Sequence, residues 1–231
     1  MKIALPILFA ILYSGMILFL SGYSHKIGIV ISENRYLNFQ VNYQVVLLAI
    51  AFLSMASSFH LNPESFKSIL SLGNISAVGE ELKIFGIKKG DNWLKTGVSL
   101  SIFISLATGL FMYFQMKGQN IDYRMLKTGI LWIILFSATN SFSEEIIYRV
   151  GINGPLYGLL SPGRLFLISA FVFGLAHIQG MPNGIIGVLL AGLLGYVLSK
   201  SVYETNGIFW AWFIHFLQDV IIIGSLYLMK R

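Results

Sequence analysis

The sequence predicts an all-α fold, a polytopic membrane helical bundle with about seven (six to eight) transmembrane helices. The first observation is the composition. Of the 231 residues, 56% are hydrophobic and only 11% are charged, and the mean hydropathy is +0.75. Soluble domains carry about 25% charged residues, so the composition indicates an integral membrane protein. The second observation is that the apolar runs are far longer than the strands of a membrane barrel, which leaves helices as the spanning elements.

Seven apolar segments can be drawn as spanning helices, each of which needs about 20 residues. In chain order they lie roughly at 3–22, 41–58, 97–115, 129–150, 164–178, 182–199 and 207–228. The first could imitate a signal peptide. Its apolar run is too long, however, and no small-x-small cleavage pattern follows Leu20, which favours a retained helix. The fifth segment is short and is expected to be tilted or partly buried.

The longest polar stretch, 59–95, is expected to hold a short interfacial helix around residues 80–90, with Trp93 at the level of the lipid headgroups. The net charge is +6, and the lysines lie mostly between the apolar segments. They indicate topology and headgroup contacts, and they exclude nucleic acid as a partner. The chain has no cysteine, which excludes disulfides, cysteine-ligated metals and a thiol nucleophile.

Two adjacent glutamates and an arginine close the fourth apolar segment. An ionised carboxylate in the middle of a bilayer costs about 2.5–3.5 kcal/mol, so this pair indicates a buried polar network or a watery cavity. On a helix, Glu145 and Arg149 are i,i+4 and can pair on one face. Glu144 points about 100° away and keeps no such partner, which suits a general base.

Two further motifs bring histidines into apolar segments. Phe173 and His177 are i,i+4 on the fifth segment, and His215 and Asp219 are i,i+4 on the seventh. A carboxylate one turn from a histidine can fix the tautomer and orientation of its ring. If the three segments converge, they provide a base, an imidazole that positions water, and donors for an oxyanion.

Each motif also has a structural interpretation. The three charged residues could form a salt-bridged helix end just beyond the bilayer, the lone histidine could be a satisfied buried side chain, and the histidine–aspartate pair could be a structural hydrogen bond. Phe173 is expected to pack, and the expected interface anchors are Tyr148, Trp210 and Trp212. The glycines that fall on one helix face, and so predict close helix packing, are Gly184, Gly187, Gly192 and Gly195.

Taken in order, the three motifs resemble those of the CPBP family, the CAAX prenyl endopeptidase and bacteriocin-processing (Abi) membrane proteins. The matching residues are Glu144, Glu145 and Arg149, then Phe173 and His177, then His215 and Asp219. The similarity divides the chain into N-terminal transmembrane helices with a polar loop (1–124), a core of CPBP/Abi type (125–222) and a C-terminal helix end (223–231), within one structural unit.

The resemblance implies an intramembrane endopeptidase whose helices surround a polar, water-accessible intramembrane cavity. It implies that Glu144 is the base that activates the hydrolytic water and that His177 helps to hold this water. His215 and the residue at 219 would polarise the scissile carbonyl and stabilise the oxyanion. The remaining two charged residues, Glu145 and Arg149, would support the base.

Position 219 departs from part of the family. Prenyl-protein processing members carry asparagine there, whereas Asp219 resembles the bacterial-type relatives. An ionised aspartate cannot donate a hydrogen bond to an oxyanion. The side chain is therefore either protonated, or its task is to orient His215.

The same polar set admits a metal alternative. Histidines and carboxylates are ordinary zinc ligands, so Glu144, His177, His215 and Asp219 could instead bind one Zn²⁺. The sequence has no His-Glu-x-x-His helix that would require this, and the glutamate mechanism implied by the resemblance needs no metal. We therefore expect no cofactor, with zinc as the alternative.

The predicted function is hydrolysis of a peptide bond in a membrane-associated peptide or lipidated protein, within the lipid bilayer of a prokaryotic plasma membrane. The oligomeric state does not follow from the sequence. A non-catalytic immunity or scaffold protein is one alternative, although every catalytic-type position is retained. A proton-relaying transporter is another, but the chain lacks paired broken helices in matching halves.

Overall fold

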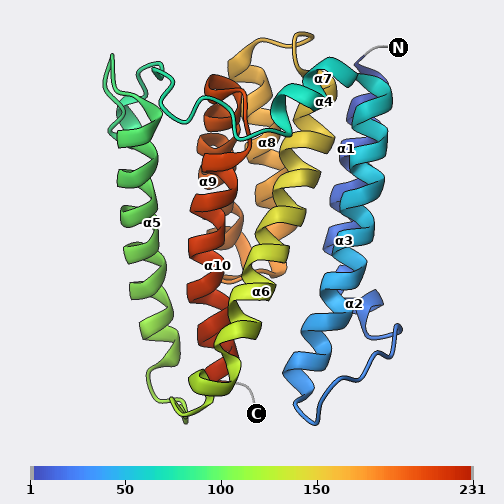
Figure 1. Cartoon of the computed structure of the whole chain (residues 1–231), viewed down its shortest axis with the longest axis vertical. Helices are drawn as coiled ribbons and strands as arrows, with labels where there is room; N and C mark the ends of the chain where they lie inside the picture. Colours follow the sequence, from blue (N-terminus) through green and yellow to red (C-terminus); the bar gives the residue numbers. More distant parts are fainter. Residues whose placement is uncertain (1–2, 230–231) are drawn as a thin grey trace.

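The computed structural model describes residues 3–229, which are built almost entirely of helices (Figure 1). Residues 1–2 and 230–231, at the ends of the predicted N-terminal and C-terminal parts, lie outside the described residues. The helical elements in chain order are α1 (Ala4–Leu18), α2 (Leu20–Ser24), α3 (Arg35–Leu61), α4 (Pro63–Ile69), η1 (Lys83–Phe85), α5 (Trp93–Met116), α6 (Met125–Glu145), η2 (Ile146–Asn153), α7 (Gly154–Leu156), α8 (Pro162–Ala176), η3 (His177–Gln179), α9 (Gly184–Thr205) and α10 (Phe209–Met229).

Within residues 3–229, six helices are long and apolar enough to cross a membrane, which confirms the polytopic helical bundle. They are Arg35–Leu61, Trp93–Met116, Met125–Leu156, Pro162–Gln179, Gly184–Thr205 and Phe209–Met229. The first predicted segment is interrupted at Phe19, and its helix α1 has 15 residues. At 1.5 Å per residue α1 is about 22 Å long, shorter than a hydrocarbon core of about 30 Å.

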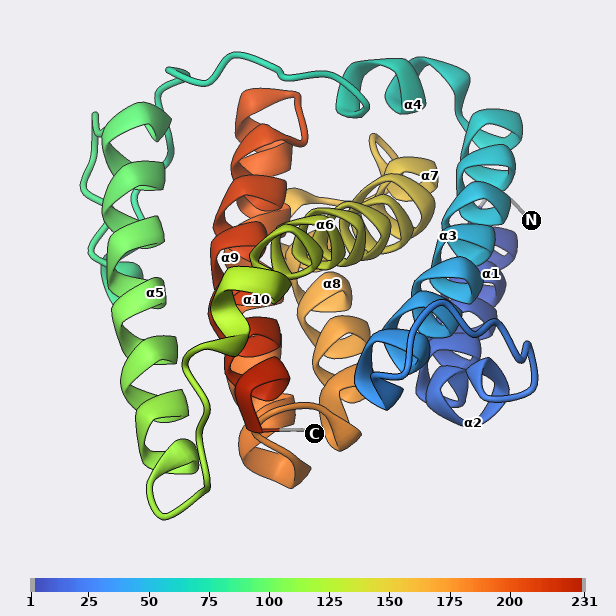
Figure 2. The same cartoon turned by 60° about the horizontal axis from the view of Figure 1, so that its bottom comes forward.

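Helix α6 and its continuation η2 lie in the middle of the bundle (Figure 2). Helix α10 packs against α6 on one side and against α5 on the other, while α3 packs along both α6 and η2. Helices α8 and α9 pack closely together, and α8 also contacts η2. The helices that carry the three motifs, α6, α8 and α10, are thereby brought into one region.

Helix α3 begins earlier than the hydropathy of its sequence predicts. The predicted segment starts at 41, whereas the helix starts at Arg35, where the side chain of Asn34 accepts hydrogen bonds from the backbone N–H groups of Tyr36 and Leu37. Such a cap is worth about 1 kcal/mol, enough to extend a helix through polar residues. The same chemistry starts α5, where Asn92 caps the first turn.

Two of the four glycines predicted to allow close helix packing, Gly192 and Gly195, do so. A Cβ atom on Gly192 or Gly195 would lie 3.2 or 3.1 Å from atoms of α8. A Cβ atom on Gly187 would lie 1.9 Å from the backbone oxygen of Pro182, in the loop before α9. The missing side chain at Gly187 therefore lets this loop, and not a neighbouring helix, approach closely. The packing prediction is wrong for Gly184, which has open space around it and a φ of 72° at the start of α9.

The interfacial helix predicted around residues 80–90 is wrong. This stretch forms a single 3₁₀ turn, η1, and is otherwise irregular. The reason is local, because Gly86 and Gly90 have φ values of 71° and 87°, in the left-handed region that an α-helix excludes. The result is a folded loop that covers one end of the bundle.

Two of the three aromatic anchors were predicted wrongly. Tyr148 and Trp210 are only 0% and 2% exposed, so they belong to the protein interior and not to a lipid-facing belt. Trp93 is 1% exposed, and its position at the level of the lipid headgroups stays a prediction. The indole Nε1 of Trp93 donates to Glu204 Oε2 at 2.7 Å, which fixes the start of α5 to α9. Trp212 is half-buried, and its anchoring stays a prediction.

Candidate active site

The three charged residues of the first motif lie inside the bundle, where α6 ends and η2 begins. Glu144 is 5% exposed, and Glu145 and Arg149 are fully buried. The segment that follows the two glutamates and contains Arg149, η2, is a π-helix, a rare backbone form that occurs frequently at functional sites. The burial places all three residues in the protein interior, which supports a buried polar network.

Glu145 is the centre of a buried ion cluster. Its Oε2 lies 2.9 Å from Arg149 Nε, which confirms the predicted i,i+4 pair. Arg149 Nη1 donates to Ser169 Oγ on α8 at 2.6 Å, and its guanidinium lies 4.9 Å from the ring centre of Phe173. The other oxygen of Glu145, Oε1, accepts from His215 Nδ1 on α10 at 2.9 Å. Glu145 and Arg149 together thus join α6 and η2 to α8 and α10.

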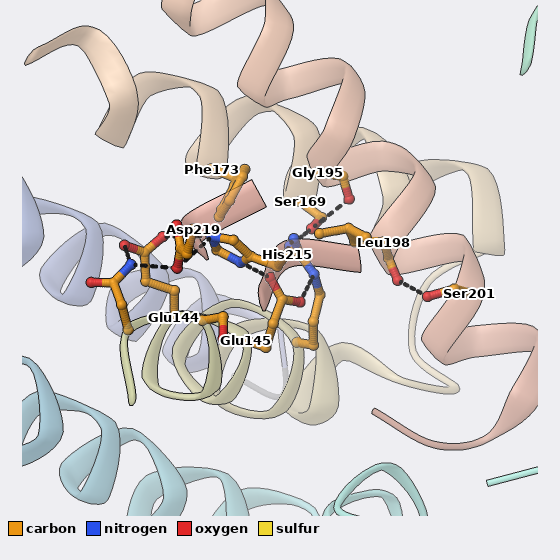
Figure 3. A network of polar contacts seen from close by, with 12 residues as sticks. Glu144, Glu145, Ser169, Phe173, Gly195, Leu198, Ser201, His215 and Asp219 are labelled. Carbon is orange, nitrogen blue, oxygen red and sulfur yellow. Dashed lines mark hydrogen bonds and ion pairs between the residues drawn. The ribbon is translucent and has the colours of Figure 1, made fainter. Parts of the chain in front are cut away.

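The partner of His215 differs from the prediction. Its Nε2 lies 3.7 Å from Asp219 Oδ2, too long for a hydrogen bond, whereas its Nδ1 bonds to Glu145. An ionised carboxylate only accepts, so the proton sits on Nδ1 and the ring turns Nε2 toward Asp219 and Glu144. Figure 3 shows His215 between these two residues on one side and Glu145 on the other. Glu145, and not Asp219, sets the tautomer of His215.

His177 stands at the junction of α8 and η3, and it is oriented by its own helix. Its Nδ1 lies 2.7 Å from the backbone oxygen of Phe173, an acceptor, so Nδ1 carries the proton. The Phe173 ring is fully buried, with its centre 4.4 Å from that of His177 and 5.7 Å from that of His215. Phe173 packs as predicted, and its packing holds both imidazoles in place.

Glu144, His177 and His215 converge on one point. Glu144 Oε2 lies 3.7 Å from His177 Nε2 and 3.9 Å from His215 Nε2. Among the described residues this oxygen is buried and has no hydrogen-bond partner. The separations are too long for direct hydrogen bonds, yet a single water molecule between the groups could contact all three.

Asp219 and the second oxygen of Glu144 meet a residue that the sequence analysis did not find. Asn140 Nδ2 donates to Glu144 Oε1 at 3.2 Å and to Asp219 Oδ2 at 3.1 Å. Gln44 on α3 donates in turn to Asn140 Oδ1 at 3.3 Å. The signal for Asn140 was present, since it lies one helical turn before Glu144. Gln44 and Ser169 offered no signal beyond being polar residues in apolar segments.

An apolar cavity of about 320 Å³ opens beside the two histidines, between α5, α8, α9 and α10. His177, His215 and Asp219 lie in its wall. Its apolar lining includes Leu100, Phe103, Ile104, Leu190, Leu194 and Val197. The helices α5 and α10 also contribute a polar pair to it, with Gln218 Nε2 donating to Thr108 Oγ1 at 3.1 Å. Its volume lies at the lower end of the range of about 300–1,000 Å³ for ligand pockets.

The polar set has the chemistry of a zinc site. Across residues 3–229, no group of three or more histidine, aspartate or glutamate side chains is placed to hold a metal ion. Glu144 Oε1 and Asp219 Oδ2 are engaged by Asn140, and Glu144 Oε2 lies 3.7 and 3.9 Å from the Nε2 atoms of His177 and His215. Ligand atoms about 2.0–2.1 Å from a tetrahedral ion lie about 3.3–3.4 Å apart, so a shift of a few tenths of an ångström would give these three atoms the spacing of zinc ligands. Zinc stays the alternative to the glutamate mechanism.

The family comparison covers the region that holds this site. The sequence model of the family described as type II CAAX prenyl endopeptidase Rce1-like matches residues 126–221, which include all three motifs. No curated protein and no solved structure matches the chain. The matched region confirms the resemblance that the motifs indicated. Residues 126–221 are thus similar to the Rce1-like type II CAAX prenyl endopeptidases of the CPBP family, and the six long apolar helices among the described residues make the protein an integral multi-pass membrane protein.

Proposed function

We propose that the protein hydrolyses a peptide bond in a membrane-associated peptide or lipidated protein, with Glu144 as the general base. The observation that carries the proposal is the buried, unpaired Glu144 Oε2, which faces the Nε2 atoms of His177 and His215. Leaving such an acceptor unsatisfied costs roughly 1–3 kcal/mol. A water molecule in the gap would remove that cost, and it would be the nucleophile.

The reaction then needs no other base. Glu144 accepts a proton from the water as the water oxygen bonds to the scissile carbonyl carbon, which gives a tetrahedral oxyanion. The same proton passes from Glu144 to the amide nitrogen. The carbon–nitrogen bond breaks, and the products are a carboxyl terminus and a free amine.

The two histidines have different tasks because their Nδ1 atoms have different partners. His177 donates through Nδ1 to a backbone carbonyl, so its neutral ring presents the Nε2 lone pair to the water. His215 is bonded through Nδ1 to Glu145, and in its doubly protonated form it presents an Nε2–H to the oxyanion. Asp219 accepts the Asn140 hydrogen bond through Oδ2, and its proposed task is to orient its neighbours.

The substrate class follows from the cavity. Its lining is apolar apart from the site residues and one polar pair, so it would accept a hydrophobic segment or a lipid chain next to the reacting groups. The family name supports a lipidated substrate in particular. The proposed location is a prokaryotic plasma membrane.

The experiment is cleavage of two reporter peptides by the purified protein in liposomes. One peptide is farnesylated at a CaaX terminus, and the other is anchored by an apolar segment without a prenyl group. We expect the wild type to cleave at least one of them and Glu144→Ala and His177→Ala to lose about 10²–10⁴-fold in rate. Glu64→Ala, at an exposed glutamate of α4, is the matched control and should cleave normally.

Equal cleavage by all variants would contradict the proposed site. No cleavage of either peptide by the wild type would favour a non-catalytic immunity or scaffold role. The same assay with a chelator addresses the metal. We expect unchanged activity, and a loss restored by added Zn²⁺ would overturn the glutamate mechanism.

A further inference from the structure

Asn140 has an amide that contacts the carboxylates of both Glu144 and Asp219. Its Nδ2 carries two hydrogens, and the distances of 3.2 Å to Glu144 Oε1 and 3.1 Å to Asp219 Oδ2 allow one for each. The same group therefore binds the proposed base on α6 and the aspartate on α10. Asp219 receives no other side-chain hydrogen bond from the described residues.

We propose that Asn140 is a positioning residue for the reaction, a proposal that rests on the proposed function. By holding Oε1 of Glu144, its amide leaves Oε2 as the oxygen directed at His177 and His215. Without that bond, the carboxylate of Glu144 could rotate toward another donor. By lying between two carboxylates, the N–H groups also offset their mutual repulsion.

The orientation of the Asn140 amide is set from a different helix. Gln44 Nε2 on α3 donates to Asn140 Oδ1 at 3.3 Å. The other amide atom of Gln44, Oε1, lies 3.0 Å from Thr139 Oγ1, whose single hydrogen also faces the backbone oxygens of Leu135 and Phe136. A flipped Asn140 would place its oxygen against two carboxylates and its nitrogen against the nitrogen of Gln44. The donor from Gln44 and the two carboxylates therefore agree on one orientation of the Asn140 amide.

The hydrogen bonds from Gln44 through Asn140 to Glu144 are also shielded from bulk water. Asn140 is half-buried, while Gln44 is 5% exposed and Glu144 is 5% exposed, so bulk water cannot easily replace these hydrogen bonds. Side chains that act through a catalytic group in this way typically change rates by about 10–100-fold when removed. Because Gln44 would act only through Asn140, the two should not act independently.

The test is a double-mutant cycle on the reporter peptide that the wild type cleaves. We expect Asn140→Leu, which keeps the volume and removes both donors, to lower kcat by about 10–100-fold and to leave KM within about threefold. Gln44→Leu should lower kcat by a smaller factor. Once Asn140→Leu is present, adding Gln44→Leu should change kcat no further, since the mutations share one path.

The matched control is Asn153→Leu. Asn153 is a buried asparagine of the same membrane span, and its amide donates to Ser199 Oγ at 2.6 Å, away from the site. We expect its thermal stability to fall and its kcat to stay within about twofold of the wild type. If Asn140→Leu does not fold, the Gln44→Leu variant still tests the positioning through kcat.

The outcomes separate this inference from the proposed function. If Glu144→Ala is inactive while Asn140→Leu keeps the wild-type kcat, the base stands and the positioning role is wrong. A raised KM with unchanged kcat would make Asn140 a substrate contact and would also overturn the inference. Strictly additive effects of Asn140→Leu and Gln44→Leu would do the same. If Glu144→Ala cleaves as well as the wild type, the proposed function itself fails.

Discussion

The candidate site has two walls that are built in opposite ways. On the side of α6 and η2, the charged groups are held by side chains from other helices: Glu145 is bonded to His215, and Arg149 to Ser169. On the side of α5 and α9, the wall is apolar. Among the described residues, the Thr108–Gln218 pair is the one side-chain hydrogen bond that joins α5 to α10. The polar wall holds its chemical groups in fixed positions, whereas the apolar wall can move to admit a substrate.

The largest expected effect is on the polar wall. Arg149→Met leaves Glu145 buried without its cation, and breaking a buried pair from one side costs about 3–5 kcal/mol. We expect a large drop in the unfolding temperature in detergent, together with loss of activity. Arg124→Ala removes an exposed arginine paired with Asp122 and should leave the unfolding temperature unchanged. Equal stability of the two variants would show that the buried cluster does not hold this wall.

A change in the apolar wall should separate activity from stability. Ala191→Phe puts a ring into the cavity from α9, where free volume can accept it. We expect kcat/KM to fall by about tenfold while the unfolding temperature stays near that of the wild type. Ile185→Phe, at an outward position of α9 that is 77% exposed, is the control. Undiminished cleavage by Ala191→Phe would place substrate binding outside this cavity.

The smallest effect is expected at the polar pair within the apolar wall. Thr108→Val removes the acceptor for Gln218 Nε2, and a single neutral hydrogen bond contributes about 0.5–1.5 kcal/mol. We expect a slight loss of stability and a change in the ratio of kcat/KM between the two reporter peptides. Thr128→Val, at an exposed threonine of α6, should change neither quantity. A loss as large as that of Arg149→Met would mean that both walls depend on polar bonds to the same degree.

The sequence predicted the features that depend on one helix at a time. The spans after the first follow from apolar length, and the Glu145–Arg149 pair follows from helical spacing. The partner of His215 could not be predicted, because it depends on how α10 is rotated against α6. The predicted helix around residues 80–90 failed for a different reason, since two left-handed glycines interrupt it.

Asn140 shows more clearly which contacts a single sequence cannot predict. Its place one turn before Glu144 was readable from the sequence, but its second contact is with a residue 79 positions away. Gln44, which sets its orientation, lies 96 positions away on α3. Contacts over such separations are set by tertiary packing and leave no periodic pattern in a single sequence.

The hydrogen bond from Gln44 has a consequence for dissecting the gene. Gln44 lies on α3, outside residues 126–221 that match the family. A fragment that encoded only the matched region would lack the group that orients Asn140, and the cover that α3 gives to α6 and η2. Exchanging the first hundred residues between relatives should likewise alter the catalytic rate without changing any motif. The unit that sequence comparison recognises is therefore smaller than the physical unit that holds the site together.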